Sequence, residues 1–308
     1  MLAQHSFEAF DTAVRVALCC STEQQFNQAQ LTLINVQDAC CRYEQLFSCT
    51  LNNSDVARIN CAGGNAVAVH PDTADLISKA LHYCKNGMGI FDITAGGLTS
   101  LWNYKRSRIP SDEQRQEALK HIDWQKVHVW QSEQQWFVQM EDPLAHIDLG
   151  GIAKGWIADR LAESLLNTGF EDFLVNLGGN IIVHGENEQH NAWRIGVTDP
   201  FSETNTPIAV LHIDNGSVVT SGTYMRCFTV NNQHYHHIID PKTAFPVKSD
   251  AVGATLVCAK SLDAEGYSTT ALALGVKAGL AFCKTIPEIE NAFFIDSSGN
   301  LHVLYGSN

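Results

Sequence analysis

Five short strand-like segments follow one another between residues 173 and 220, and they constrain the fold of this chain most. They are rich in β-branched and aromatic residues, and hairpin-like turns separate them. The segments cover residues 173–177, 180–184, 193–197, 208–213 and 217–220. Strands and helices follow in mixed order elsewhere, so the pattern predicts an α+β fold with mixed, largely antiparallel sheets and packed helices.

The remaining predicted elements surround this run of strands. Apolar residues recur at helical spacing over residues 25–47, 72–86, 153–166 and 265–274, and Gly87 closes the second of these helices. Residues 13–19, 127–130 and 136–140 and two short C-terminal segments have the pattern of strands. No internal repeat or low-complexity linker divides the sequence, so we expect a single compact domain over residues 1–308.

Charge and cysteine content exclude several classes of function. The formal net charge of −13 argues against nonspecific nucleic-acid binding and adhesion to an anionic membrane, because both need a basic face. The first 20 residues lack the pattern of a secretory signal, and no apolar run is long enough to insert across a membrane. The ten cysteines contain no CxxC spacing, so we expect reduced, mostly buried thiols in a cytoplasmic protein. The sequence indicates no particular oligomeric state.

The stretch HIDLGGIAKGWIADRL, residues 146–161, joins a strand end to an amphipathic helix through two glycines. The first turn of a helix carries unpaired N–H groups and a partial positive charge, so a glycine-lined entry lets a phosphate approach the backbone. The same glycines also suit an ordinary tight turn. Both interpretations stay open, and we expect Lys154 to hold this turn or a phosphate and not to act as a base.

Further candidate residues lie in the last third of the chain. Glu265 and Thr269 are four apart, so on a helix they share a face that suits Mg²⁺ or simply marks a polar helix start. His237 has the chemistry of a general base, and Asp240 could fix its tautomer. The HYHH run also raises a zinc hypothesis, which is disfavoured because a strand would point His236 and His237 to opposite faces.

Five segments, taken in order, carry a resemblance to a known family. They are GIFDITAGGLTSLW (89–102), the glycine stretch above, VNLGGNIIVHG (175–185), VVTSGTYMRCF (218–228) with HHIIDPKTAFPV (236–247), and SLDAEGYSTTALALG (261–275). In the fourth, TSG supplies hydroxyls and a flexible turn that suit phosphate or flavin, or a plain hairpin. Together with RYEQLFSCTLNNSDVARIN, these segments resemble the ApbE-like flavin transferases, the FAD:protein FMN transferases, over nearly the whole chain.

The resemblance implies a T-fold-like architecture and a specific reaction. Members of this family bind FAD and Mg²⁺, cut the pyrophosphate, transfer FMN to a threonine or serine hydroxyl of a client flavoprotein, and release AMP. We therefore expect Mg²⁺-dependent FMN transfer, with FAD as substrate and a client flavoprotein as partner. A noncatalytic FAD carrier or regulator, and an FAD pyrophosphatase, stay as alternatives.

The resemblance also implies roles for individual residues. His237 and Asp240 would be catalytic, while the backbone carbonyl of Ala153 and the side chains of Glu265 and Thr269 would bind the metal. The glycine turn would lie beside the FAD pyrophosphate. The full set of expected cofactor-binding residues is Phe10, Thr12, Phe91, Asp92, Thr94, Gly150, Gly151, Lys154, Gly178, Gly179, Thr220, Ser221 and Gly222.

The sequence departs from the family's pattern at four places. Phe10-Asp11 stands where the family has methionine and glycine, so an aromatic ring would stack on the adenine. Glu265 replaces an aspartate and is one methylene longer, which displaces a predicted metal ligand. Ala244 replaces a glycine and restricts φ if its turn needs a left-handed residue. Asn180 replaces an aspartate and removes a negative charge.

Overall fold

The computed structural model describes residues 1–204 and 206–306, which form two compact units. Unit 1 contains residues 1–44 and 152–221 and continues from Asp250 to the end of the described chain. Unit 2 contains residues 45–151 and 222–249. Each unit is assembled from segments that are distant in the sequence, and a single domain over the whole chain stays a prediction.

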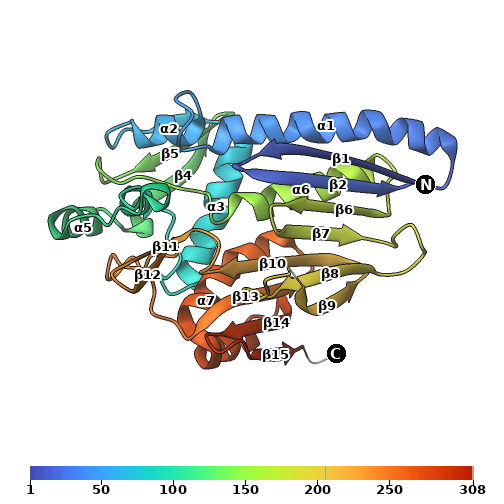
Figure 1. Ribbon diagram of the computed structural model, residues 1–308. Coiled ribbons are helices and arrows are strands. Elements are labelled where there is room, and N and C mark those ends of the chain that lie inside the picture. The colour runs from blue at the N-terminus through green and yellow to red at the C-terminus, as the bar shows by residue number, and fades with distance from the viewer. Residues whose placement is uncertain (205, 307–308) are drawn as a thin grey trace. The chain divides into compact units, whose positions relative to one another are not determined.

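An eight-stranded sheet forms the framework of unit 1 (Figure 1). Its order is β1-β2-β6-β7-β10-β13-β14-β15, and the registers β1–β2, β2–β6, β6–β7, β7–β10, β13–β14 and β14–β15 are antiparallel. The strands span Leu2–Ala9, Thr12–Cys19, Phe173–Leu177, Asn180–His184, Gly216–Gly222, Ala251–Cys258, Ile289–Asp296 and Leu301–Tyr305. This arrangement confirms the predicted α+β fold with largely antiparallel sheets.

Both faces of this sheet are covered where neighbouring residues of a strand are apolar, as in β14. Phe294 lies against Gly279 of α7 (Ser261–Lys284), and α6 (Ala153–Asn167) packs on α7 and on β6 and β7. Phe293 points the other way, into a cluster with Trp193 and Ile195 of the hairpin β8–β9 (Trp193–Thr198, Pro207–Ile213). Helix α1 (Glu23–Phe47) joins the helical side, where the ring of Tyr43 meets that of Trp156 edge-on.

Unit 2 combines a small sheet with a separate hairpin. The sheet has the order β3-β5-β4 and packs against α2 and α3, while Trp102 and Phe228 belong to a core shared by α4 and the hairpin β11–β12. The elements are α2 Asp55–Asn60, β3 Val67–Val69, α3 Pro71–Asn86, α4 Gly96–Thr99, η1 Tyr104–Arg106, α5 Asp112–Leu119, η2 Trp124–Lys126, β4 Val127–Ser132, β5 Gln135–Met140, β11 Cys227–Val230 and β12 Gln233–His236.

Most predicted elements are present with bounds close to those expected, and several expectations were wrong. The last helix begins at Ser261 and runs to Lys284, with a break at Gly275, where φ is 81°. Strand β10 continues to Gly222, so TSG is strand and not a turn. Strand β12 ends at His236, so strand alternation does not extend to His237. All ten cysteines are free, but only five of them are buried.

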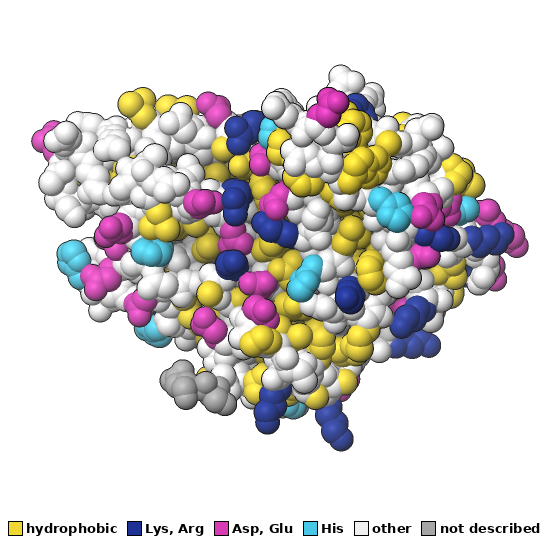
Figure 2. All heavy atoms as spheres, turned by 180° about the vertical axis from the view of Figure 1, so that it is seen from behind, with side chains coloured by type: hydrophobic (Ala, Val, Ile, Leu, Met, Phe, Trp, Pro, Cys, Tyr) yellow, Lys and Arg dark blue, Asp and Glu magenta, His cyan; other side chains and the backbone are white. Residues whose placement is uncertain are grey.

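Charge is mixed on one face of the molecule. On the face drawn in Figure 2, Lys and Arg side chains are interspersed with Asp and Glu side chains and with apolar areas. Within residues 1–204 and 206–306, none of the helices has the length and apolar character needed to cross a bilayer.

Candidate functional site

Two tight turns lie together at one end of the unit 1 sheet. Phe10 and Asp11 link β1 to β2, and Gly178 and Gly179 link β6 to β7; all four residues have positive φ, between 56° and 95°. Such two-residue loops match the twist of antiparallel strands. The β2–β6 register places the turns side by side, and a Cβ on Gly178 would lie only 2.2 Å from the Thr12 hydroxyl oxygen. Gly178 is therefore needed for its backbone conformation and for this close approach.

The same end of the sheet continues into β10 and α7. Because Val219 pairs with Asn180, the following residues Thr220 and Ser221 lie beside the glycine turn. The Ser221 hydroxyl lies 2.9 Å from that of Ser268 and 3.4 Å from that of Thr269. Thr12, Gly178, Gly179, Thr220, Ser221 and Thr269, all predicted site residues, thus form one polar row within unit 1.

Lys154 and Glu265 form a buried ion pair between α6 and α7. Lys154 Nζ donates to Glu265 Oε1 at 2.6 Å, and the backbone N–H of Gly155 donates to Oε2 at 2.5 Å. The Glu265 side chain is only 7% exposed, and that of Lys154 is 25% exposed. Both carboxylate oxygens therefore have a donor, one from a charged side chain and one from the first turn of α6, where the helix dipole favours an anion.

Gly155 explains why α6 and α7 approach so closely at this point. A Cβ on Gly155 would lie 2.7 Å from the Ser261 carbonyl oxygen and 3.0 Å from Glu265 Cβ. Real Cβ atoms do not come this close to backbone, so any larger residue would push the helices apart. The glycine of the AKG triplet thus serves helix packing and brings Glu265 to the start of α6.

Asp159 holds the start of α7 from the neighbouring helix. Its carboxylate accepts from the N–H groups of Ser261 at 2.7 Å and Leu262 at 3.1 Å, so it caps a helix that lacks a side-chain cap of its own. Burial raises the pKa of this carboxyl to about 6, and the two N–H bonds oppose the rise. Sequence reasoning missed Asp159, because its partners lie about 100 residues away.

In unit 2, several predicted cofactor residues stabilise their own loops. Asp92 Oδ1 accepts from the N–H of Thr94 at 2.8 Å and from its hydroxyl at 2.6 Å, and the Thr94 hydroxyl accepts from the N–H of Asp123. Burial raises the pKa of Asp92. A Cβ on Gly151 would lie 3.1 Å from the Phe91 ring, so this predicted pair is in close contact.

The Gly-Gly turn and the segment before it are held by polar side chains. This segment was expected to be a strand end, but only His146 forms an isolated bridge, to Ala95. Asp148 Oδ1 accepts from the N–H of Gly150 at 2.8 Å. The side-chain amide of Asn60 accepts from the N–H of Ile147 and donates to its carbonyl, at 2.7 and 2.9 Å. Asn60 ends the SDVARIN segment, so that segment positions the glycine turn from a distance of 87 residues along the chain. In the sequence, Asn60 was recognisable only as part of a segment that resembles the family's pattern.

His237 and Asp240 lie in the loop after β12. The N–H of His237 donates to the Arg226 carbonyl at 3.0 Å. Asp240 Oδ1 accepts from the N–H of Lys242, and Oδ2 accepts from the hydroxyl of Thr243. The Asp240 carboxylate therefore stabilises its own turn. Burial lowers the pKa of the neighbouring His236 to about 4, so that ring is neutral at pH 7.

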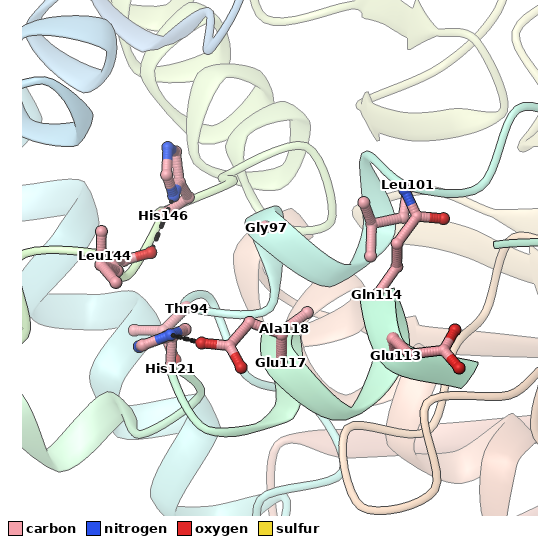
Figure 3. A pocket seen from close by; sticks show the side chains of 10 residues that line it. All are labelled: Thr94, Gly97, Leu101, Glu113, Gln114, Glu117, Ala118, His121, Leu144 and His146. Atoms are coloured by element: carbon pink, nitrogen blue, oxygen red, sulfur yellow. Dashed lines mark hydrogen bonds and ion pairs between the residues drawn. The ribbon is translucent and has the colours of Figure 1, made fainter. Parts of the chain in front are cut away.

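A cavity of about 550 Å³ opens in unit 2 beside α4 and α5 (Figure 3). Leu101 and Ala118 contribute apolar walls, and Thr94 contributes to the lining from among the predicted site residues. His121 lies between Asp142, 2.9 Å away, and Glu117, 3.5 Å away, and the hydrogen bond to Asp142 is the main cause of its raised pKa. Glu117 and His121 of the cavity wall are therefore already paired.

The predicted metal ligands differ in how available they are. A carboxylate, a hydroxyl and a backbone carbonyl are the hard oxygen donors that Mg²⁺ takes, so Glu265, Thr269 and Ala153 fit it in chemical type. The carboxylate, however, already accepts from Lys154 and Gly155. Elsewhere too, no group of three His, Cys, Asp or Glu side chains that could hold a metal occurs among the described residues.

Comparison with known proteins identifies the family of this chain. The model of the ApbE family matches residues 10–293. This chain belongs to the ApbE family. It is 31% identical to the FAD:protein FMN transferase of Treponema pallidum, over 81% of this chain and 73% of that protein. It is 32% identical to a protein of the same name from Klebsiella pneumoniae, over 82% of this chain and 78% of the relative.

Solved structures of ApbE proteins share the fold. The ApbE protein of Thermotoga maritima superposes with a TM-score of 0.87 and 28% identity, covering 98% of this chain and 96% of its own. The flavin transferase ApbE of Vibrio cholerae gives a TM-score of 0.83 at 22% identity, covering 100% and 97% of the two chains. The second likeness concerns the fold alone.

The positions that are expected to depart from the family's pattern carry backbone strain or an unusual polar contact. Ala244 has a φ of 61° and is fully buried, so its turn does need the left-handed conformation that glycine adopts most easily. Asp11 has a φ of 57° in the β1–β2 turn. Asn180 accepts from the Ser261 hydroxyl, and its buried Nδ2 has no hydrogen-bond partner among the described residues.

Proposed function

We propose that this ApbE-family protein transfers FMN from FAD to a threonine or serine hydroxyl of a client flavoprotein and releases AMP. The observation that carries the proposal is the polar row of unit 1. Residues that the resemblance assigns to FAD, from the two turns of the sheet and from β10, lie together there with Thr269 of α7, an expected metal ligand. Glu265, one helical turn before Thr269, forms the ion pair with Lys154 at the start of α6.

The reaction is a substitution at the phosphorus of the FMN half. The acceptor hydroxyl oxygen bonds to this phosphorus, the bond to the bridging oxygen breaks, and AMP leaves with that oxygen. His237 takes the proton of the hydroxyl, since a neutral imidazole suits this task at neutral pH. Lys154 and the first turn of α6 balance the negative charge of the pyrophosphate.

Mg²⁺ completes the proposed site. When bound, it supplies positive charge that lowers the repulsion between the phosphoryl group and the attacking oxygen. The residues that would hold it are Glu265, Thr269 and the carbonyl of Ala153. We also propose a cytoplasmic location, which the ten free thiols support because reduced cysteines are usual in that compartment.

One incubation tests the proposed function. The protein is mixed with FAD, MgCl₂ and a client flavoprotein fragment; AMP is measured by chromatography and the client by intact-mass spectrometry. We expect AMP together with flavin attached to the client, and no attachment to a matched client whose acceptor threonine is valine. AMP with free FMN would identify a pyrophosphatase instead, and FAD binding without AMP would identify a carrier.

A further inference from the structure

The Glu265 carboxylate occupies the place at the start of α6 where an anionic ligand would bind. It accepts from the backbone N–H of Gly155, in the first helical turn, and from Lys154 Nζ. A phosphate at a helix start uses the same two kinds of donor. With only 7% of its side chain exposed, Glu265 is largely removed from water. The Glu265 carboxylate thus uses the two donors, Lys154 and the Gly155 N–H, that are proposed to balance the charge of the FAD pyrophosphate.

The close approach of α6 and α7 makes this contact possible. Because position 155 is a glycine, Glu265 Cβ lies so near the α6 backbone that it would be only 3.0 Å from a Cβ on that glycine. Lys154, the residue before Gly155 in α6, forms the ion pair with this carboxylate. The residue that departs from the family's aspartate is therefore the residue that pairs with Lys154.

It is electrostatically unfavourable for this carboxylate to bind a metal ion and the Lys154 ammonium group at the same time. A divalent ion that bound Glu265 would lie within a few ångströms of the ammonium group, which is 2.6 Å from the same carboxylate, and like charges at that separation repel strongly where water is excluded. Metal binding at Glu265 would therefore require Lys154 to leave first. An anionic pyrophosphate offers Lys154 and the Gly155 N–H a replacement partner.

We propose that Lys154 and a divalent cation exclude each other at Glu265, and that the FAD pyrophosphate releases the site by drawing Lys154 away. Metal and FAD then strengthen each other's binding, and this linkage is reciprocal. The half of the proposal that involves FAD rests on the proposed function, whereas the exclusion of metal by Lys154 does not.

Mn²⁺ binding to the full chain without FAD tests the exclusion, with the free ion measured by electron paramagnetic resonance. We expect Lys154→Met to bind Mn²⁺ at least tenfold more tightly than the wild type. Lys277→Met removes an equal charge from an exposed position of α7 and should match the wild type. The double variant Lys154→Met/Glu265→Gln should lose this gain in Mn²⁺ affinity.

Thermal unfolding gives a second readout. Mn²⁺ should raise the Tm of Lys154→Met more than that of the wild type, because it replaces the cation beside a buried carboxylate.

Two results would overturn the exclusion: Lys154→Met binding Mn²⁺ no more tightly than Lys277→Met, or the double variant binding as tightly as Lys154→Met. If Lys154→Met does not fold, Lys154→Gln replaces it in the same comparison. A second arm adds FAD to the wild type, where we expect Mn²⁺ affinity to rise at least tenfold. If Lys154→Met binds Mn²⁺ more tightly but FAD does not change the Mn²⁺ affinity of the wild type, the exclusion is upheld. The proposal that FAD releases the site is then refuted. Absence of flavin transfer to the client refutes the proposed function and leaves the first arm unaffected.

Discussion

Replacing Asp159 with asparagine should remove a pH dependence from the stability of this protein. The Asp159 carboxylate caps α7 through two N–H groups, yet burial outweighs these bonds and raises its pKa from 3.8 to about 6. The folded protein therefore holds this proton more tightly than the unfolded chain does. The resulting stabilisation is complete below pH 3.8 and is lost as the pH rises through 6.

The two pKa values determine the size of the effect. With 3.8 in the unfolded chain and about 6 in the folded one, the proton stabilises the fold by roughly 1 kcal/mol at pH 5 and contributes almost nothing at pH 7. The wild type should thus lose roughly 1 kcal/mol relative to Asp159→Asn between these two pH values. Water that reaches the partly exposed carboxylate reduces this figure.

Urea unfolding followed by tryptophan fluorescence at pH 5, 6 and 7 measures the difference. The matched control is Asp214→Asn, which changes an exposed aspartate of unit 1 and should follow the wild type at each pH. The reasoning fails if the difference between wild type and Asp159→Asn is constant over this range. It also fails if the wild type gains stability relative to the variant as the pH rises, because the two N–H bonds would then outweigh the burial of the carboxylate.

Three further predictions concern the site. Gly178→Ala should destabilise the protein by at least about 2 kcal/mol more than Gly169→Ala in urea unfolding, because both glycines have positive φ but only Gly178 faces a side chain, that of Thr12; equal losses would show that the clash relaxes freely. Phe10→Ala should weaken FAD binding by about three- to tenfold in calorimetry and leave FMN binding unchanged, since an aromatic stacking contact is worth about 0.5–1.5 kcal/mol; an equal loss for both flavins would contradict an adenine contact. His237→Ala should lower kcat for flavin transfer by about 10²–10⁴-fold without changing FAD affinity, as loss of a general base requires; an unchanged kcat would remove His237 from the mechanism.

The elements of the fold were largely readable from local sequence. Strands β6 and β7 were predicted residue for residue, because apolar and β-branched runs end at turn-forming glycines. The end of α3 at Gly87 was marked in the same way. Helix α7 was predicted to begin four residues too late, because its first N–H groups are capped by Asp159 from another helix. A cap supplied from a distance leaves no mark in the sequence around the helix start.

The candidate site shows the same division between local and distant information. The family's pattern in the sequence singled out Lys154 and Glu265, and their chemical types alone allow a phosphate contact and a metal contact. Tertiary structure decided that they bind each other, across 111 residues of chain, because Gly155 lets α6 and α7 approach to backbone contact. It also decided that Asp92, Thr94 and Asp240 stabilise their own loops. A sequence determines which donors and acceptors a chain owns, but packing determines the distances between them, and polar partners form only at hydrogen-bonding distance.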